Sequence, residues 1–140
     1  MDLAMDAAET AAYLAEVYPV AAEKFTIEAL APLSAQVRLK VGPEDLRPGG
    51  TVSGPSLFML ADCAFYVATL AMIGRRALAV TTNCSIDFMR KPAAEADILA
   101  DVSILKLGRV LVVGDVLMRS EGQEAPVARA SVTYSIPPAG

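Results

Sequence analysis

The feature that most constrains this chain is a long apolar segment near its middle, Ser56–Gly74 (SLFMLADCAFYVATLAMIG), whose one charged residue is Asp62. The segment is long enough to raise the question of a membrane span, and Arg75 and Arg76 follow it as an anchor would. A carboxylate in hydrocarbon costs roughly 2.5–3.5 kcal/mol even on the lenient insertion scale. The rest of the chain also contains amphipathic strands that need a cover. We therefore predict a buried core helix and no membrane contact.

Local residue types mark the two ends of this helix. Ser53 is favoured at a helix N-cap, Gly54 can bend sharply, and Pro55 stands where a helix makes no use of an amide hydrogen. Gly74, followed by two arginines, is typical of a helix end. The pattern predicts a central helix over residues 53–74.

The remaining chain is typical of one short helix and a set of strands. Residues 6–17 carry apolar side chains at helical spacing and Pro19 ends them, which predicts a helix within residues 1–20. Residues 42–50 are rich in Gly and Pro and predict a loop. Short polar separators between the later strands suit hairpins or short crossings. The predicted strands are 25–41, 78–89, 97–107, 110–119 and 127–136, and the separators are 90–92, 108–109 and 121–124.

The order of these elements predicts the fold. A helix that is apolar nearly all round must be buried on nearly all sides, and an antiparallel sheet curled around it supplies that burial. We therefore predict an α+β hot-dog fold, a curved antiparallel sheet wrapped around a long central helix, as a single domain over residues 1–140. Such a sheet leaves an edge strand exposed, so we expect at least a homodimer.

The composition excludes several kinds of chemistry. The chain contains no histidine, which removes the mechanisms and metal sites that depend on imidazole. Its two cysteines, Cys63 and Cys84, are too few for a zinc site or a disulfide scaffold. The formal net charge is −4 without a basic stripe, so we expect no nucleic-acid partner. The N-terminus lacks the features of a secretory signal, so we expect a cytoplasmic location. An enzyme built from this chain must use carboxylates, hydroxyls and backbone amides, and we expect neither metal nor cofactor.

Asp62 is the outlier of the apolar segment. The residues three and four positions away on the helix are Phe58, Met59, Phe65 and Tyr66. A carboxylate in such surroundings suits a general base or nucleophile acting on a carbonyl. The alternative is a core aspartate satisfied by backbone or threonine donors.

The start of the predicted helix is the second candidate for chemistry. A helix N-terminus has unpaired amides and a positive dipole end, which favour developing negative charge. Pro55 cannot donate, so an oxyanion must rely on Gly54, on Ser56 or later amides, or on water. The alternative is that this turn is only a helix cap.

The segment 47–62 (RPGGTVSGPSLFMLAD) resembles the signature loop and helix of hot-dog acyl-CoA thioesterases of the phenylacetate-degradation (PaaI-like) type. That family has a His-Gly-Gly turn and then a helix with a Leu-Ala-Asp motif. This chain has Ser53-Gly54-Pro55 in place of the turn, and Arg47 where many members carry an asparagine. The resemblance continues through residues 105–109 (LKLGR) to the C-terminus and covers most of the chain.

The resemblance implies an acyl-CoA thioesterase in which Asp62 is the general base or nucleophile and the Gly54 amide is the oxyanion donor. In related enzymes a hydroxyl at the spacing of Thr81 lies across the dimer interface and helps orient the water or the carboxylate. For a threonine in a strand, plain β-propensity is the alternative. The implied partners are an acyl-CoA substrate and further copies of the chain, as a homodimer or homotetramer.

Coenzyme A carries phosphates that require cations. The acyl group requires an apolar pocket, and this chain permits an aromatic or a medium-chain acyl group. The four cations predicted to bind these phosphates are Arg90, Lys91, Lys106 and Arg109, which stand at strand ends or turns. The alternative is that they are ordinary solvated charges on the surface. The predicted substrate-binding residues are Ser53, Pro55, Phe58, Tyr66, Asn83, Arg90, Lys91, Lys106 and Arg109.

Two other functions are alternatives. A hot-dog hydratase usually needs an Asp–His pair, which a chain without histidine cannot form. A non-catalytic protein that binds acyl-CoA or another ligand is the second, because the turn lacks the histidine and Pro55 lacks a donor. Release of free thiol from a panel of acyl-CoA esters distinguishes the enzyme from the binder.

Overall fold

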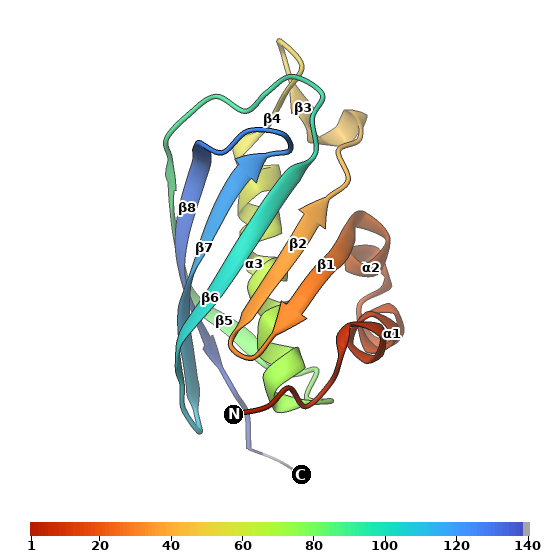
Figure 1. The fold of residues 1–140 in the computed structure, drawn as a ribbon, viewed down its shortest axis with the longest axis vertical. Helices are drawn as coiled ribbons and strands as arrows, with labels where there is room; N and C mark the ends of the chain where they lie inside the picture. Colours follow the sequence, from red (N-terminus) through yellow and green to blue (C-terminus); the bar gives the residue numbers. More distant parts are fainter. Residues whose placement is uncertain (139–140) are drawn as a thin grey trace.

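The computed structural model describes residues 1–138 and confirms the α+β architecture, in which a curved antiparallel sheet lies around a long central helix (Figure 1). The last two residues of the predicted domain lie outside the described residues. The elements are α1 (Ala7–Val17), α2 (Pro19–Lys24), β1 (Phe25–Ala31), β2 (Ser34–Leu39), η1 (Pro43–Asp45), β3 (Leu46–Arg47), β4 (Thr51–Val52), α3 (Gly54–Ile73), β5 (Val80–Phe88), β6 (Ile98–Leu107), β7 (Leu111–Ser120) and β8 (Pro126–Ser135).

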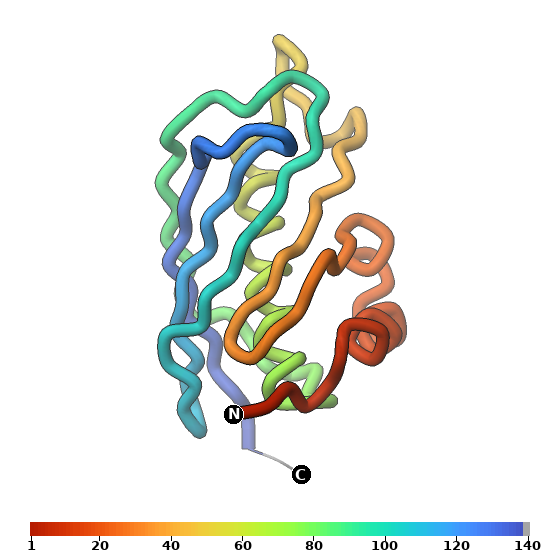
Figure 2. Tube along the Cα trace, viewed as in Figure 1, coloured from red at the N-terminus to blue at the C-terminus, as the bar shows by residue number. Residues whose placement is uncertain are grey.

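The main sheet has the strand order β1-β2-β6-β7-β8-β5, and every neighbouring pair is antiparallel. Tight connections join β6 to β7 and β7 to β8, as predicted. The separator at 90–92 is different, because β5 pairs with β8 and not with β6. The chain from β5 therefore passes over the end of the β7–β8 hairpin to reach β6 (Figure 2). This crossing leaves β5 at the edge of the sheet.

Helix α3 is the core of the molecule and contacts β1, β2 and β5–β8. Leu60, Phe65 and Leu70 are fully buried. The helix is apolar and long enough to span a membrane, but 78% of its most apolar window is buried inside the protein, which is the pattern of a core helix. Its caps are those predicted: Ser53 Oγ accepts a hydrogen bond from Ser56 N at 3.3 Å, and Gly74 ends the helix with φ +88°.

In the first third of the chain one prediction is wrong in detail and another is confirmed but incomplete. Residues 25–41 form the hairpin of β1 and β2 rather than one strand, and Leu33 turns the chain with φ +62°. Leucine is not a usual residue at positive φ. The turn therefore lacks the glycine or asparagine that would have predicted it from the sequence. Pro19 not only ends α1 but also begins α2, because proline is well suited to the first position of a helix.

The predicted loop at 42–50 contains more structure than its composition indicates. It holds the 3-10 turn η1 and the strand β3, which pairs with β4 in a two-stranded ladder. Ser53 N donates to Asp45 O at 2.7 Å. The loop is thereby tied to the first residues of α3.

Candidate active site

Asp62 lies near the middle of α3 with its carboxylate partly buried. Its Oδ1 accepts two hydrogen bonds, one from Thr81 Oγ1 at 2.5 Å and one from the Tyr134 hydroxyl at 2.9 Å. The same hydroxyl is 3.0 Å from the backbone oxygen of Asp62. Within residues 1–138 no side chain donates to Oδ2. One carboxylate oxygen is therefore held, and the other is free.

The partner of Asp62 is Thr81 of the same chain, whereas the resemblance implied a hydroxyl across a dimer interface. A β-bulge decides that this partner is Thr81 and not Thr82. Ile86 and Cys84 pair with inward-facing residues of β8, so regular alternation would bring Thr82 opposite Tyr134. The register shifts between Thr81 and Asn83, and Thr81 becomes the cross-strand partner of Tyr134. Bulges commonly redirect side chains beside active sites in this way.

Tyr134 is the functional residue that the sequence analysis missed. It is buried, and its ring lies 5.5 Å from the ring of Phe65 and 6.0 Å from that of Tyr66. Burial, and then the charge of Asp62, raise the pKa of the Tyr134 phenol far above its usual range, so the hydroxyl keeps its proton. Alternation along β8 predicts an inward position for this residue, but sequence alone does not separate a core tyrosine from a hydrogen-bond donor to Asp62.

A cavity of about 340 Å³ opens beside the Asp62 carboxylate. Tyr66 lies in its wall and donates its hydroxyl to Ala77 O at 2.8 Å, and the Tyr18 ring meets it edge-on at 6.4 Å. The lining is largely apolar and aromatic: Val17, Tyr18, Asp62, Cys63, Tyr66, Ala77, Leu78, Ala79, Val80, Thr81 and Tyr134. Thr69, two turns along the helix from Asp62, is fully buried and does not reach this cavity.

The thiol of Cys63, which lines the cavity beside Asp62, is not a nucleophile. Burial, and then the charge of Asp62, raise the pKa of Cys63 to about 12. The thiol is therefore neutral near pH 7. Cys84 is partly buried on β5, and burial raises the pKa of its thiol as well. Among the described residues that line the cavity, Asp62 is the carboxylate.

A second cavity, of about 540 Å³, lies at the N-terminus of α3. Gly54 is the first residue of the helix, and no described residue accepts a hydrogen bond from its N–H. Arg90 and Lys91, two of the four cations predicted to contact CoA, border this cavity. The full lining is Arg47, Pro48, Thr51, Val52, Gly54, Leu57, Phe88, Arg90, Lys91 and Pro92.

One chain does not bring Gly54 and Asp62 together. They are eight residues apart on the same helix, about 12 Å along its axis, and they line different cavities. A bound thioester within one chain cannot contact both. Arg109 lies farther still, because it borders a cavity with Arg76, beyond the opposite end of α3, and Lys106 is three residues before it near the end of β6. That end of α3 is about 30 Å from Gly54.

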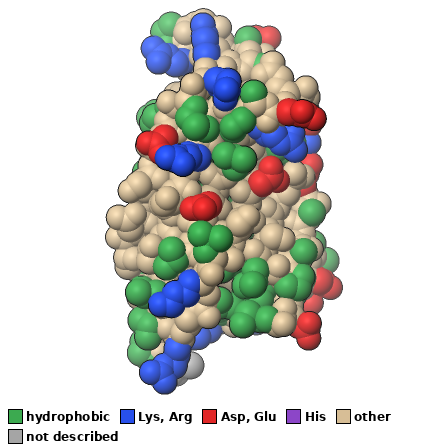
Figure 3. All heavy atoms as spheres, turned by 60° about the vertical axis from the view of Figure 1, so that its left-hand side comes forward, with side chains coloured by type: hydrophobic (Ala, Val, Ile, Leu, Met, Phe, Trp, Pro, Cys, Tyr) green, Lys and Arg blue, Asp and Glu red, His purple; other side chains and the backbone are tan. Residues whose placement is uncertain are grey.

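The other predicted binding residues lie on the surface or serve as a cap. Pro55 and Phe58 are exposed on α3, and Asn83 is exposed on β5. Ser53 caps the helix. Figure 3 shows Lys and Arg side chains in the upper and lower thirds of the face that includes β5, with apolar patches between and beside them.

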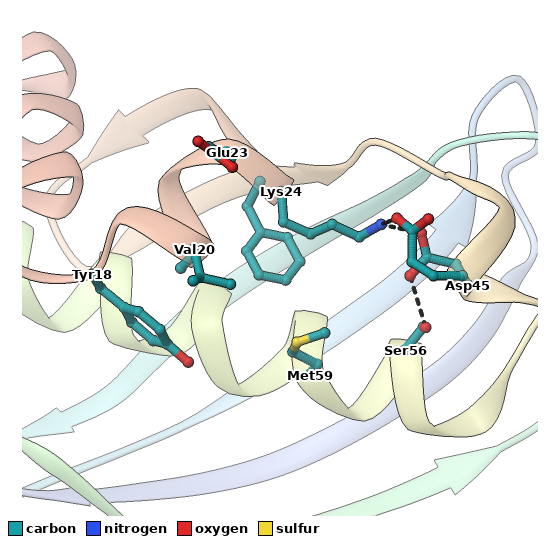
Figure 4. Close-up of a pocket in the computed structure, with 10 residues that line it drawn as sticks. Tyr18, Val20, Glu23, Lys24, Asp45, Ser56 and Met59 are labelled. Atoms are coloured by element: carbon teal, nitrogen blue, oxygen red, sulfur yellow. Dashed lines mark hydrogen bonds and ion pairs between the residues drawn. The ribbon is translucent and has the colours of Figure 1, made fainter.

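A buried ion pair secures the start of α3 (Figure 4). Asp45 is 1% exposed, and it accepts hydrogen bonds from Lys24 Nζ, from Gly42 N at 2.8 Å and from Ser56 Oγ at 2.8 Å. Burial by itself raises the pKa of Asp45, but these donors outweigh it and lower the pKa below its ordinary value. The cluster borders a cavity of about 470 Å³ whose other lining residues include Tyr18, Val20 and Met59. It joins α2, η1 and α3 and so supports the position of Gly54.

Within residues 1–138, no three His, Cys, Asp or Glu side chains are grouped so as to hold a metal ion. The arrangement offers a carboxylate with one free oxygen, an unpaired amide at a helix start, and apolar space. A carboxylate with a free oxygen and an unpaired backbone amide are groups that can take part in attack on a carbonyl.

Comparisons with known proteins agree with this chemistry. The family model of the Thioesterase superfamily matches residues 49–127, more than half of the chain. No curated protein matches the sequence. A candidate thioesterase from Silicibacter sp. TM1040 is 56% identical, with coverage of 99% of this chain and 96% of that one and a TM-score of 0.92.

Two proteins of phenylacetic acid degradation are also similar. The PaaI protein of Thermus thermophilus, in a mutant form, is 30% identical over 85% of this chain and 99% of its own, with a TM-score of 0.71. The Escherichia coli PaaI protein is 25% identical over 94% of each chain, with a TM-score of 0.80. The chain therefore belongs to the Thioesterase superfamily and is a hot-dog protein of the PaaI-like type.

Proposed function

We propose that this protein is a cytoplasmic acyl-CoA thioesterase that hydrolyses its substrate to a free acid and CoA. The observation that carries the proposal is the Asp62 carboxylate, which has one oxygen held by two hydroxyls and the other unengaged by residues 1–138, at the wall of an apolar cavity. A general base or a nucleophile needs a free oxygen of this kind.

In the proposed reaction, Asp62 either activates a water molecule or attacks the thioester carbonyl directly. Attack places negative charge on the carbonyl oxygen, and the Gly54 N–H stabilises that charge with the help of the helix dipole. The C–S bond then breaks and CoA leaves as a thiolate. In the general-base route the thiolate takes the proton that Asp62 removed from water, and in the direct route it takes a proton from solvent. Direct attack gives an anhydride that water must hydrolyse, whereas the general-base route gives the acid in one step.

The separation of Gly54 from Asp62 is the reason to propose a homodimer, with a tetramer as a pair of dimers. A twofold axis that crosses the exposed side of α3 can bring Gly54 of one chain beside Asp62 of the other, and it does so twice. Strand β5 supports the same arrangement, because among residues 1–138 it has a partner strand on one side only. Its residues Val80 and Phe88 are each 56% exposed, which is costly for an edge strand left in water.

We expect the protein to sediment as a dimer or tetramer of the 14.7 kDa chain at micromolar concentration. Analytical ultracentrifugation over a concentration series measures this. A monomer across the whole range would contradict the shared site, because one chain keeps the two groups about 12 Å apart.

The cavity beside Asp62 is the proposed acyl site. Its volume of about 340 Å³ lies in the range of sites for small ligands. Tyr18, Tyr66 and Tyr134 are among its lining residues, which suits an aromatic or medium-chain acyl group. Tyr66 is thereby kept as a substrate contact.

Arg90 and Lys91 are the proposed contacts for the phosphates of CoA, because they border the same cavity as Gly54. Replacing both with alanine is expected to raise KM for acyl-CoA esters roughly tenfold, since two exposed charge contacts of about 0.7 kcal/mol each combine to that factor. The turnover number should change little, because these contacts act equally on the bound substrate and the transition state. Steady-state kinetics at two salt concentrations measure both effects, and the rise should shrink at high salt.

Two controls accompany this variant. An N-acetylcysteamine thioester lacks the nucleotide, so the variant should hydrolyse it like the unmodified protein. The double variant Lys106→Ala with Arg109→Ala tests the other predicted pair, at the opposite end of α3. A larger rise in KM in this second variant would indicate that the nucleotide binds at that end of α3. If the Arg90 and Lys91 variant hydrolyses the acyl-CoA ester and the N-acetylcysteamine thioester equally poorly, these two cations do not bind CoA.

The experiment that tests the proposed function is release of free thiol from a panel of acyl-CoA esters, including phenylacetyl-CoA, hexanoyl-CoA and acetyl-CoA. A non-catalytic acyl-CoA-binding protein is the second candidate, favoured by the turn Ser53-Gly54-Pro55, which has no histidine and lacks one amide donor. Turnover supports the enzyme. Binding of the same esters by calorimetry without turnover would establish the binder instead.

A further inference from the structure

Tyr134 enters the candidate site from β8, the strand next to β5, and it forms or breaks no bond in the proposed reaction. Its hydroxyl is within hydrogen-bond distance of two atoms of one residue, Asp62 Oδ1 at 2.9 Å and Asp62 O at 3.0 Å. A donor between the side chain and the backbone of the same aspartate restricts rotation of that side chain. The carboxylate is held against its own helix.

The second donor to Oδ1 comes from the residue that faces Tyr134 across the ladder. Thr81 and Tyr134 are cross-strand partners, and Thr81 Oγ1 lies 2.5 Å from the same oxygen. Both donors therefore act on Oδ1, and within residues 1–138 neither side chains nor backbone amides engage Oδ2. The two carboxylate oxygens are chemically different in this site.

We propose that Tyr134 is a positioning residue which, together with Thr81, holds Asp62 Oδ1 and leaves Oδ2 as the oxygen that acts on the thioester or on its water. The proposal rests on the function proposed above for Asp62. Tyr134 need not touch the substrate to act, because its effect passes through the orientation of the carboxylate.

The surroundings of the phenol suit a permanent donor. Tyr134 is 4% exposed, and the rings of Phe65 and Tyr66 pack against its own ring. Burial raises the pKa of its hydroxyl, so the proton stays on the phenol beside the negative carboxylate. Hydrogen bonds to a charged group are stronger than those between neutral groups.

The test is Tyr134→Phe, which removes the hydroxyl and keeps the ring and its packing. The matched control is Tyr13→Phe, because Tyr13 is also buried and its hydroxyl bonds a backbone group, Ala77 N at 3.1 Å, away from Asp62. Two measurements are made on each variant: steady-state kinetics on the best acyl-CoA ester of the panel, and a crystal structure that shows the conformation of Asp62. Thermal unfolding checks that both variants fold.

We expect Tyr134→Phe to lower kcat on the order of tenfold, the worth of one hydrogen bond to a charged group, with KM within twofold. In its crystal structure the Asp62 carboxylate should leave its single orientation. Thr81→Val, which removes the other donor, should give the same pattern in both measurements. Tyr13→Phe should change neither kcat nor the orientation of Asp62.

A kcat within twofold of the unmodified protein, or an Asp62 that keeps its orientation in Tyr134→Phe, overturns the positioning role. A rise in KM with unchanged kcat also overturns it, because Tyr134 would then only line the acyl cavity. The structural measurement needs no turnover. A chain that hydrolyses no ester therefore refutes the proposed function, while the crystal structures still decide whether Tyr134 orients Asp62.

Discussion

Replacing Asp62 with asparagine is expected to lower kcat by roughly 100-fold or more and to leave the fold intact. Asparagine has the shape of aspartate and keeps one oxygen that can accept from Thr81 Oγ1 and from the Tyr134 hydroxyl. It loses the negative charge and the free oxygen that the general-base and nucleophilic routes both require. The measurement is steady-state hydrolysis of the best acyl-CoA ester, with thermal unfolding to verify the fold.

The matched control for this substitution is Asp115→Asn. Asp115 lies on β7 with its side chain exposed, and it borders neither the Asp62 cavity nor the Gly54 cavity. Asp115→Asn removes the same charge from the protein as Asp62→Asn does. Because Asp115 lies outside both cavities, kcat should stay near that of the unmodified chain. Near-normal turnover in Asp62→Asn would show that Asp62 is a core aspartate and would remove the proposed mechanism.

Replacing Gly54 with proline is expected to lower kcat by about 100-fold, because removal of one oxyanion donor costs about that much in hydrolytic enzymes. The geometry accepts proline at this position. Gly54 is the first residue of α3, where an amide hydrogen makes no helical bond, and Ser53 before it is extended with φ −76° and ψ 157°. The substitution therefore removes the N–H with little change to the helix.

The control for this variant is Gly54→Ala, which keeps the N–H and adds the same Cβ atom. That atom would lie 3.3 Å from Cζ of Phe88, whose side chain is more than half exposed and has room to shift. Gly54→Ala is therefore expected to lose much less activity than Gly54→Pro. Equal losses in the two variants would mean that contact with Phe88, and not the amide, matters.

The two damaging substitutions together test whether the site is shared between chains. A mixture refolded from Asp62→Asn and Gly54→Pro chains contains heterodimers in which one of the two sites has both native groups. Random pairing should restore about a quarter of the activity of the unmodified protein. A mixture that stays as inactive as its components would contradict a site shared between two chains.

Several features of the chain follow from local sequence alone. The apolar residues on all sides of α3 require burial, so a sheet must surround this helix, and alternation in β6, β7 and β8 indicates which side chains face it. Ser53 and Gly74 mark the helix ends through capping chemistry that involves only their neighbours. Asp62 stands out for the same reason, as a charge in a segment that is otherwise apolar.

Other features depend on contacts between distant parts of the chain. The turn at Leu33 has no glycine, so its positive φ is imposed by the pairing of β1 with β2 rather than by residue preference. The bulge in β5 selects Thr81 over its neighbour, and a one-residue change of register reverses which side chain faces inward. Tyr134 is 72 residues from Asp62 in sequence, and only the closure of the sheet around α3 brings its hydroxyl to the carboxylate.

The difference between the features that local sequence determines and those that only the tertiary structure decides has a physical basis. Periodicity, capping and composition act over a few residues, and they determined the α+β class, the central helix and the identity of the outlying carboxylate. Strand order and register are set by packing across the whole chain, and they decided that Oδ1 of Asp62 is held while Oδ2 is free. The rigid rise of a helix likewise decided that Gly54 and Asp62, both recognised from the sequence, lie about 12 Å apart in one chain.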